Sequence, residues 1–401
     1  MYNRGMRNTP HFCILPFLHM EIQPNGQVYV CCHSNDQVPI GNLHEKTLLE
    51  IWTSEGVQKV REAFLSGEGN KNKHCQDCFF QESIGMDSWR IKENENWNYY
   101  LDNFKELDGI PFPKSLSIRF SNLCNFSCRT CKPSTSTAWF ADAKFMNPKG
   151  KFVKLTSAPA SNPLIEQIKP FVKHLQHIYF AGGEPLMEME HYEIIKLFSE
   201  ENPDVNLSYD TNFSLFSLGK HNVFDYWPKF SKLFLSTSVD GFGPKGEYIR
   251  KGFEWEEFKK NWQLARQNLP KAKLKMNFTL SIYNCLHVLD TVEEFKRLNL
   301  LKDGDLDISL VEEPRRLSIA ALPKELKAEV ERRYREYMKS NDWPVVNKKL
   351  EDAMAYMNSI DDSNLFPEFK SFTKQLDLLR SEDFTELFKE EAQMFDLKKV
   401  L

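Results

Sequence analysis

The chain has 401 residues, of which 41% are hydrophobic and 27% charged, and its formal net charge is −4. This composition is that of a soluble globular protein, and the near balance of 52 basic and 56 acidic side chains argues against a nucleic-acid-binding or membrane-surface protein. No segment approaches the roughly 20 apolar residues that span a bilayer, and residues 1–10 are too polar for a secretory signal. We therefore expect a protein of the reducing cytoplasm, in which the nine cysteines are metal ligands or catalysts rather than disulfides.

The first 90 residues contain five of the nine cysteines and only short apolar runs. Asn25-Gly26 is a strong turn signal between two extended stretches, so a β-hairpin is expected over residues 22–31. Apolar residues at mostly helical spacing predict a helix over residues 47–64. We interpret residues 1–90 as a small cysteine-rich α+β domain.

A mixed polar and aromatic stretch, residues 91–114, ends in a proline-rich turn and is interpreted as a linker. Strands and helices alternate over residues 115–314, a pattern typical of a parallel sheet. The predicted strands are Leu116–Phe120, His177–Phe180, Asn206–Tyr209, Lys232–Val239, Lys273–Ser281 and Asp305–Val311, and helices are expected over Met187–Glu200, Glu254–Leu269 and Leu286–Leu298. Six units fit a partial (β/α)6 TIM-like barrel better than a closed eightfold one, and in such barrels the reactive groups lie at the C-terminal ends of the strands.

Residues 315–401 are highly charged and helical in pattern. Apolar side chains recur every three or four positions in two stretches of this region, which begin at Leu326 and Phe366. We interpret the region as a helical cap over the open side of the barrel, because a reactive centre needs shielding from solvent. A docking surface for a partner is the alternative.

Three cysteines follow the first strand of the predicted barrel in a C-x3-C-x2-C pattern: Cys124, Cys128 and Cys131. Fe–S clusters are usually held by cysteine thiolates, and three thiolates on one loop can hold three corners of a cubane cluster. The remaining iron would then be open to a ligand, as metals in catalytic sites generally are. A structural zinc site is the alternative, although zinc prefers four N or S ligands and no fourth Cys or His follows nearby.

With this loop, residues 115–314 resemble the radical S-adenosylmethionine superfamily, whose signature is C-x3-C-x2-C after the first strand of a partial barrel. The resemblance implies that a [4Fe–4S] cluster on the three cysteines is the catalytic centre. It would bind S-adenosylmethionine at the open iron and cleave it to methionine and a 5′-deoxyadenosyl radical, which abstracts hydrogen from a substrate. The residue before the third cysteine is often aromatic in that family and lies near the adenine; here it is Thr130.

The resemblance also implies cofactor contacts on later strands. Gly182-Gly183-Glu184-Pro185, after the second strand, would contact the amino group of the methionine moiety, and paired glycines allow such close backbone approach. Ser238 and Arg250 would hold its carboxylate, for which a guanidinium fork is well suited. Asp210 and Asn212, at the end of the third strand, are expected polar contacts to ribose or substrate. The remaining expected cofactor-binding residues are Phe126, Thr130 and Asp240.

The N-terminal region holds a second group of cysteines, Cys13, Cys31, Cys75 and Cys78. Four thiolates suit either a closed iron–sulfur cluster or structural zinc, and spacing alone does not decide between them. The C-x(9–15)-G-x4-C segment and the later C-x2-C nevertheless resemble the SPASM and twitch extensions of the superfamily. The number of cysteines fits the twitch version, which carries one auxiliary [4Fe–4S] cluster, with Cys32 as an alternative to Cys31. Such an extension usually follows the barrel, whereas here it precedes it.

The resemblance therefore implies a radical S-adenosylmethionine enzyme of the oxidoreductase or maturase type. Enzymes with such extensions often modify peptides or proteins, so the expected substrate is a peptide or protein side chain. A nucleotide or small cofactor precursor is the alternative substrate, and a non-catalytic iron–sulfur electron carrier or scaffold is the alternative function. A ferredoxin or flavodoxin is the expected electron donor.

Overall fold

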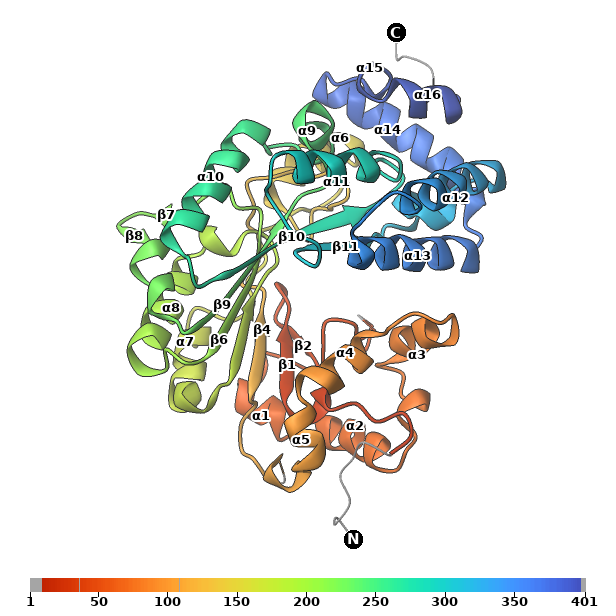
Figure 1. The fold of residues 1–401 in the computed structure, drawn as a ribbon. Coiled ribbons are helices and arrows are strands. Elements are labelled where there is room, and N and C mark those ends of the chain that lie inside the picture. Colours follow the sequence, from red (N-terminus) through yellow and green to blue (C-terminus); the bar gives the residue numbers. More distant parts are fainter. Residues whose placement is uncertain (1–8, 36, 108, 398–401) are drawn as a thin grey trace. The chain divides into compact units, whose positions relative to one another are not determined.

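The computed structural model describes residues 9–35, 37–107 and 109–397, and strands and helices alternate between β4 and β11 (Figure 1). The first eight residues of the predicted N-terminal domain and the last four of the predicted C-terminal region lie outside the described residues. Within the described ranges, no helix has the length and apolar character needed to cross a membrane.

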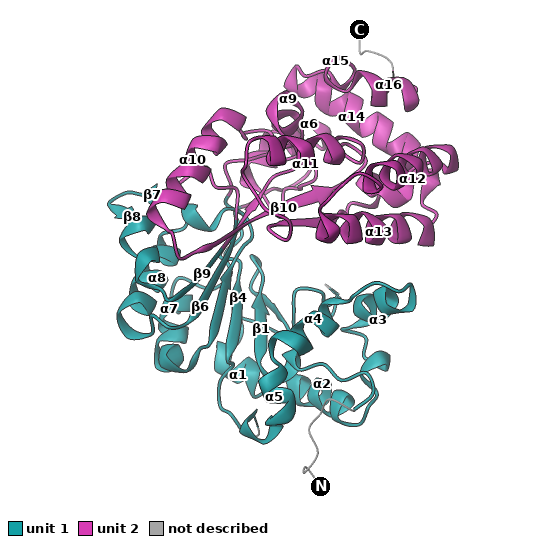
Figure 2. Cartoon of the chain, viewed as in Figure 1, with its two compact units in different colours: residues 1–123, 154–210, 216–234 teal, residues 124–153, 211–215, 235–401 magenta. Residues whose placement is uncertain are grey.

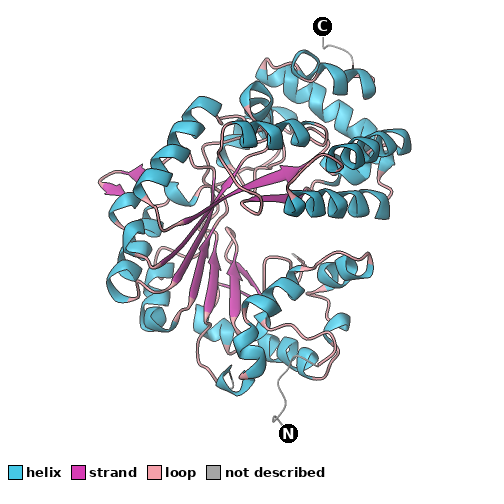
Figure 3. Cartoon of the chain, viewed as in Figure 1, coloured by secondary structure: helices cyan, strands magenta, loops and turns pink. Residues whose placement is uncertain are grey.

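Nine strands form one mostly parallel sheet in the order β11-β10-β9-β6-β5-β4-β1-β2-β3, an α/β arrangement consistent with a partial TIM-like barrel (Figure 3). Each of the six strands expected from the sequence is present, as β4, β5, β6, β9, β10 and β11, and they are neighbours in chain order. The strands are β1 His19–Ile22, β2 Gln27–Tyr29, β3 Gly41–Asn42, β4 Ser115–Ile118, β5 His177–Phe180, β6 Asn206–Thr211, β9 Lys232–Ser238, β10 Lys273–Leu280 and β11 Leu306–Leu310, with β7 Ser217–Leu218 and β8 His221–Asn222 as a separate pair.

The three helices expected between the later strands are present as α8, α10 and α11, and the C-terminal region is helical as expected. The α-helices are α1 Leu48–Trp52, α2 Glu55–Leu65, α3 Gln76–Ser83, α4 Trp89–Asn96, α5 Asn98–Asp102, α6 Phe140–Met146, α7 Leu164–Ile168, α8 Met189–Glu201, α9 Gly243–Ile249, α10 Trp255–Asn268, α11 His287–Arg297, α12 Lys324–Met338, α13 Pro344–Ser359, α14 Phe366–Arg380, α15 Phe384–Leu387 and α16 Lys389–Met394.

The expected N-terminal hairpin is formed by β1 and β2, which pair antiparallel with Ile22 opposite Val28. Its first strand also pairs in parallel with β4, with His19 opposite Ser115. The amides of Ser115 and Arg119 donate to the carbonyls of Leu18 and Ile22 at 2.9 and 3.0 Å. The sequence did not reveal this second pairing, by which the cysteine-rich region adds three strands to the sheet.

Two other expectations differ from the structure. The single helix predicted over residues 47–64 is two helices, α1 and α2, because the side chains of Thr47 and Ser54 each cap the start of one. The predicted linker, residues 91–114, includes most of α4 and all of α5, and Tyr100 and Leu101 pack in the same core as Cys13 and Cys31.

The chain divides into two compact units, each of which is built from three separate segments of the sequence (Figure 2). Unit 1 comprises residues 1–123, 154–210 and 216–234, and unit 2 comprises residues 124–153, 211–215 and 235–401. Unit 1 therefore contains the cysteine-rich region and strands β1 to β6 as far as Asp210, and unit 2 contains β10, β11 and the C-terminal helices.

Side chains alternate between the two faces of the parallel strands in unit 1, as a pleated strand requires. One face is apolar and packs on α8, where the rings of Phe120 and Phe180 lie 6.2 and 5.1 Å from that of His191. The opposite face carries polar side chains at every second position, for example Glu21, Ser117 and Tyr179, which are in register across β1, β4 and β5.

Candidate cofactor sites

The three cysteines of the C-x3-C-x2-C pattern lie on one loop of unit 2 that begins directly after Leu123. The amide of Cys131 donates to the carbonyl of Cys128 at 3.0 Å, which closes a turn between these two residues. The amide of Phe126 donates to the Cys124 sulfur at 3.4 Å, and the Asn212 side-chain amide lies 4.0 Å from the same sulfur. Cys128 is buried, whereas Cys124 and Cys131 are half-buried.

The loop is held by the segment that contains Arg250. The amides of Ser127 and Arg129 donate to the carbonyls of Lys251 and Ile249 at 2.9 and 2.7 Å. An ideal Cβ on Gly252 would lie 2.7 Å from the ring of Phe126, so only glycine permits this close contact. The sequence-predicted Phe126 and Arg250 are thus brought together, with the guanidinium carbon 5.9 Å from the ring centroid.

Arg250 is buried and lies beside the thiols. Its Nη1 donates to the Asp240 carboxylate at 3.0 Å, while its Nε has no hydrogen-bond partner within the described ranges. Burial lowers the pKa of Arg250, but Cys128 and Asp240 raise it overall, so the guanidinium stays charged. A hydrogen bond with Cys128 lowers the pKa of Cys131, and Arg250 lowers it further.

Asp240 was expected to contact a cofactor, but its carboxylate is fully buried and already bonded. One oxygen accepts from Arg250, and the other accepts from the amide of Thr279 at 3.0 Å. Through these contacts, Asp240 positions the side chain of Arg250. Ser238 lies half-buried at the end of β9, and Thr130 is half-buried on the cysteine loop.

The Gly182–Pro185 segment belongs to unit 1 and packs on the residues just before the cysteine loop. The amide of Glu184 donates to the carbonyl of Leu123 at 2.7 Å. Both glycines have positive φ, and an ideal Cβ on Gly183 would lie 2.4 Å from that carbonyl oxygen. The Glu184 side chain is buried and accepts from the amide of Leu186 at 3.2 Å, so it shapes the turn that follows.

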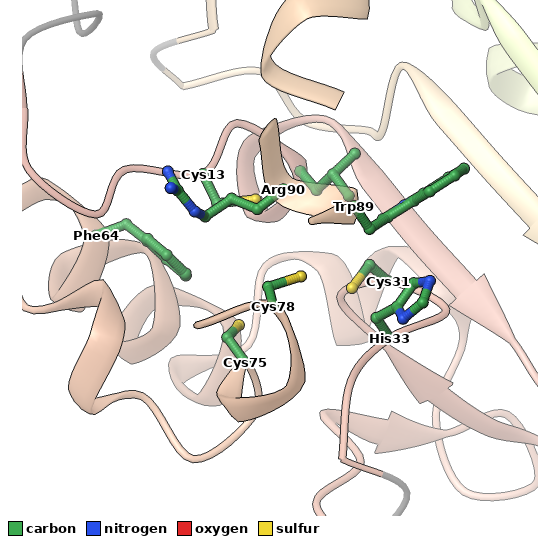
Figure 4. Close-up of a pocket in the computed structure, with 9 residues that line it drawn as sticks. Cys13, Cys31, His33, Phe64, Cys75, Cys78, Trp89 and Arg90 are labelled. Carbon is green, nitrogen blue, oxygen red and sulfur yellow. The ribbon is translucent and has the colours of Figure 1, made fainter. Parts of the chain in front are cut away.

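The four N-terminal cysteines of the second group come together within unit 1 (Figure 4). They line one cavity, with about 290 Å³ of empty space that includes some open to solvent. The sulfurs come from different elements. Cys13 precedes a short 3₁₀ turn, and Cys31 follows β2. Cys75 is the N-cap of α3, and Cys78 lies in the first turn of that helix. The other residues that line the cavity are Leu15, His33, Phe64, Trp89 and Arg90.

All four of these cysteines are buried, whereas Cys32 is exposed. Burial raises the pKa of each of the four thiols, and neighbouring cysteines add to the shift at Cys13, Cys31 and Cys75, so that the pKa of Cys31 is about 12. Four thiolates buried this closely together are poorly stable without a cation. The placement of Cys31 inside the cavity and of Cys32 outside it favours Cys31 as the ligand.

The two groups of thiols are candidate ligands of iron–sulfur clusters because of their residue type, number and placement. Among the described residues, no three His, Cys, Asp or Glu side chains are arranged to hold a single metal ion. Three thiols and a charged arginine with a free buried nitrogen suit an open cluster and an anionic ligand, and four buried thiols suit a closed cluster.

Sequence reasoning missed Arg129, which lies within the cysteine loop and is fully buried. Its Nη2 donates to the carboxylates of Asp377 and Glu382, at 2.6 Å each, and its guanidinium lies 3.6 Å from the ring centroid of Tyr248. Arg380, on α14, donates to the carbonyl of Ser127 at 2.8 Å. The C-terminal helical region thus holds the cysteine loop from within unit 2. An arginine between two motif cysteines was the only signal in the sequence.

One comparison with known proteins covers the N-terminal group of thiols. The SPASM family, an iron–sulfur cluster-binding domain, matches residues 13–79. The GTP 3′,8-cyclase of Campylobacter lari is 30% identical over 105 residues, which cover 25% of this chain and 27% of that protein. The enzyme of the same name from Campylobacter curvus is 29% identical over 102 residues, covering 24% and 26%. The chain thus spans about a quarter of the length of these curated relatives.

Two solved structures resemble the chain distantly. Native anSMEcpe with bound AdoMet is 19% identical, covers 57% of this chain and 62% of that one, and has a TM-score of 0.38. Streptococcus suis SuiB bound to its precursor peptide SuiA is 14% identical, covers 62% and 53%, and has a TM-score of 0.32. At these TM-scores the likeness supports no conclusion about this chain.

Proposed function

We propose that the chain is a radical S-adenosylmethionine enzyme, in which the segment matched by the SPASM family, residues 13–79, is an iron–sulfur domain. We further propose that it cleaves S-adenosylmethionine reductively and abstracts hydrogen from a peptide or protein side chain. Cys124, Cys128 and Cys131 would hold a [4Fe–4S] cluster. When bound, that cluster supplies one electron and one iron without a protein ligand. The observation that carries the proposal is the loop with three thiols, which is hydrogen-bonded to the segment that contains the charged Arg250.

The residues of this chain have distinct roles in the proposal. Arg250, oriented by Asp240, has a free buried Nε that can donate to the carboxylate of S-adenosylmethionine. Gly182 and Gly183 expose backbone at close range for its amino group, and Ser238 and Asn212 are further polar contacts. Phe126 and Thr130 lie on the cysteine loop itself and are further proposed contacts to the cofactor.

The second thiol group would hold an auxiliary [4Fe–4S] cluster of the twitch type. Cys13, Cys31, Cys75 and Cys78 provide four ligands, so every iron would be bound by protein, and electron transfer is the proposed role. A ferredoxin or flavodoxin is the proposed electron donor, and a reducing cytoplasm the proposed location.

We take the six strands from β4 to β11 as a (β/α)6 partial barrel over residues 115–314, preceded by the domain of residues 1–90 and followed by a helical cap at residues 315–401. The contacts of Arg129 with Asp377 and Glu382 support a shielding role for that last region, because they fix its helices to the cysteine loop.

A nucleotide or cofactor precursor is the second candidate substrate. Its support is the local sequence identity to two GTP 3′,8-cyclases, which covers a quarter of this chain. The peptide candidate is supported by the SPASM match, because enzymes with such an extension often modify peptides or proteins.

The proposed cleavage is tested by anaerobic incubation of the reconstituted protein with S-adenosylmethionine and dithionite. We expect release of 5′-deoxyadenosine, measured by chromatography, from the wild-type protein and from Cys32→Ala, whose thiol is exposed. A variant with Cys124, Cys128 and Cys131 all changed to Ala should release none. A reduced cluster without 5′-deoxyadenosine would instead identify an electron carrier or scaffold.

A further inference from the structure

The cavity that the four N-terminal thiols share is completed by helix α4. Trp89 and Arg90, the first two residues of this helix, line the cavity together with the cysteines (Figure 4). The segment matched by the SPASM family ends earlier in the chain, at residue 79. Two residues that the matched segment does not contain therefore belong to the wall around the thiols.

The Arg90 side chain is held in one position by three hydrogen bonds. Its Nε and Nη2 donate to the two oxygens of the Glu82 carboxylate at 2.9 and 2.7 Å, a bidentate pair. Its Nη1 donates at 2.7 Å to the carbonyl of Phe12, the residue directly before Cys13. The guanidinium is thus fixed at the wall of the cavity, and its side chain is only 15% exposed.

Helix α4 also holds the backbone on both sides of Cys13. Asn94 Nδ2 donates to the Phe12 carbonyl at 2.9 Å, and Asn94 Oδ1 accepts from the amide of Ile14 at 3.0 Å. The Phe12 carbonyl therefore accepts from two side chains of this helix, those of Arg90 and Asn94. These contacts fix the backbone that carries one of the thiols relative to the arginine.

Arg90 acts on the thiols through its backbone and through its charge. Burial raises the pKa of Cys78, while a hydrogen bond from the Arg90 backbone and the charge of the guanidinium lower it. The same charge lowers the pKa of Cys13, where burial raises it by more. Arg90 therefore favours negative charge on these two sulfurs.

The other charges near the thiols have the opposite effect. Among the described residues that line the cavity, Arg90 alone carries a fixed positive charge. Burial lowers the pKa of His33, so this ring is mostly uncharged at neutral pH. The carboxylates of Glu82, Asp77 and Glu93 each raise the pKa of a neighbouring thiol. The field at the thiols thus depends on one arginine set against these carboxylates.

From this placement we infer that Arg90 raises the reduction potential of the auxiliary iron–sulfur cluster proposed for the four thiols, and that Glu82 moderates this effect. The inference rests on that proposed cluster and specifies a residue that controls its electron transfer. One-electron reduction adds one negative charge to a cluster, and a fixed cation beside the sulfurs stabilises the added charge. Net charge and hydrogen bonds to the sulfurs are among the properties that set such potentials.

The inference is tested by redox titration of the whole reconstituted chain with dithionite, followed by electron paramagnetic resonance. Cys124, Cys128 and Cys131 are changed to Ala, so that the signal comes from the N-terminal thiols. We expect Arg90→Gln to lower the ratio of reduced to oxidised cluster at a fixed potential about tenfold, which corresponds to a potential about 59 mV lower. Glu82→Gln should raise the same ratio about threefold, because it removes a carboxylate and leaves Arg90 in place.

Two further variants separate charge from packing. Arg90→Lys keeps the positive charge and should stay within about threefold of the wild-type ratio. Lys92→Gln removes an exposed cation of the same helix and should change the ratio by less than about twofold, since salt screens exposed charges. Shifts of opposite sign in Arg90→Gln and Glu82→Gln identify an electrostatic effect, because both variants break the same ion pair.

Equal potentials in the wild-type protein, Arg90→Gln and Glu82→Gln would overturn the inference, and so would shifts of the same sign. If Arg90→Gln does not fold, Glu82→Gln decides alone, since an unchanged or lower potential contradicts the inference. This variant is also measured with all cysteines present. Zinc in place of iron at the N-terminal thiols would overturn both the auxiliary cluster and the inference, whereas release of 5′-deoxyadenosine tests the proposed cleavage separately.

Discussion

The two thiol groups of this chain are assembled in opposite ways. Cys124, Cys128 and Cys131 lie within eight consecutive residues, and much of what fixes their loop comes from residues far along the chain. Cys13, Cys31, Cys75 and Cys78 are spread over 66 residues, and their surroundings come from the same N-terminal region. The first group has half-buried members beside a charged arginine, whereas the second is wholly buried.

This difference indicates what each group is built to do. A short loop with three thiols would leave one iron of a cluster open to a further ligand. Contacts from distant residues can adjust the position of the loop without changing the three cysteines. A cavity closed by four buried thiols has no such room, and a metal cluster there would stabilise the local fold, as structural metals do.

The largest expected effect comes from removing one buried thiol from each group. Cys128→Ala should reduce release of 5′-deoxyadenosine by about 100-fold or more, because losing a ligand should exceed the roughly 10–100-fold cost of losing a residue that supports one. Cys78→Ala, with a thiol of similar burial, should retain cleavage but bind about four fewer iron atoms per chain. The measurements are chromatography of 5′-deoxyadenosine and an iron assay. Equal loss of cleavage in both variants would contradict the division of roles.

A second prediction concerns the long-range support of the cysteine loop. Arg129→Met should lower the free energy of unfolding by about 3–5 kcal/mol, because it leaves the buried Asp377 carboxylate without its cation. Urea unfolding under anaerobic conditions measures this change. Arg332→Met is the control, since Arg332 pairs with Glu329 and Glu336 at the surface and should cost at most about 1 kcal/mol. A similar cost for both would mean that Arg129 does not anchor the loop.

The smallest expected effect separates backbone strain from close contact in the Gly182–Pro185 segment. Gly183 and Gly243 have nearly equal φ values of +56° and +54°, so alanine should cost about 1 kcal/mol at either through strain. Only at Gly183 would the new Cβ meet a neighbour, the carbonyl oxygen of Leu123 at 2.4 Å. We therefore expect Gly183→Ala to lose about 1–3 kcal/mol more in stability and to weaken S-adenosylmethionine binding in equilibrium dialysis. Indistinguishable variants would show that this contact is unimportant.

Local patterns in the sequence were enough to predict the six strands, their helices and both groups of cysteines. Alternation, turn residues and motif spacing are properties of neighbouring residues, so one sequence carries them. The pairing of β1 with β4 joins His19 to Ser115, and the ion pair of Arg129 joins it to Asp377. Neither contact leaves a local signal, because nothing near Arg129 distinguishes a buried arginine from an exposed one.

The split of the predicted helix at residues 47–64 was a different kind of error. Both capping residues, Thr47 and Ser54, are visible in the sequence, but the apolar spacing on either side of Ser54 is close to a single helical period and so predicts one helix. The polar face that includes Glu21 is visible as alternation in β1 and β4, but the neighbours of each side chain on that face depend on which strands pair.

The pairing of β1 with β4 has a consequence for how the chain can be divided. Strand β4 pairs in parallel with β5 on one side and with β1 on the other. A protein truncated to start at residue 115 would expose the amide and carbonyl groups that β1 now covers, and a bare strand of this kind recruits strands from other molecules. The cysteine-rich region thus also covers the edge of β4 and keeps that strand from pairing with strands of other molecules.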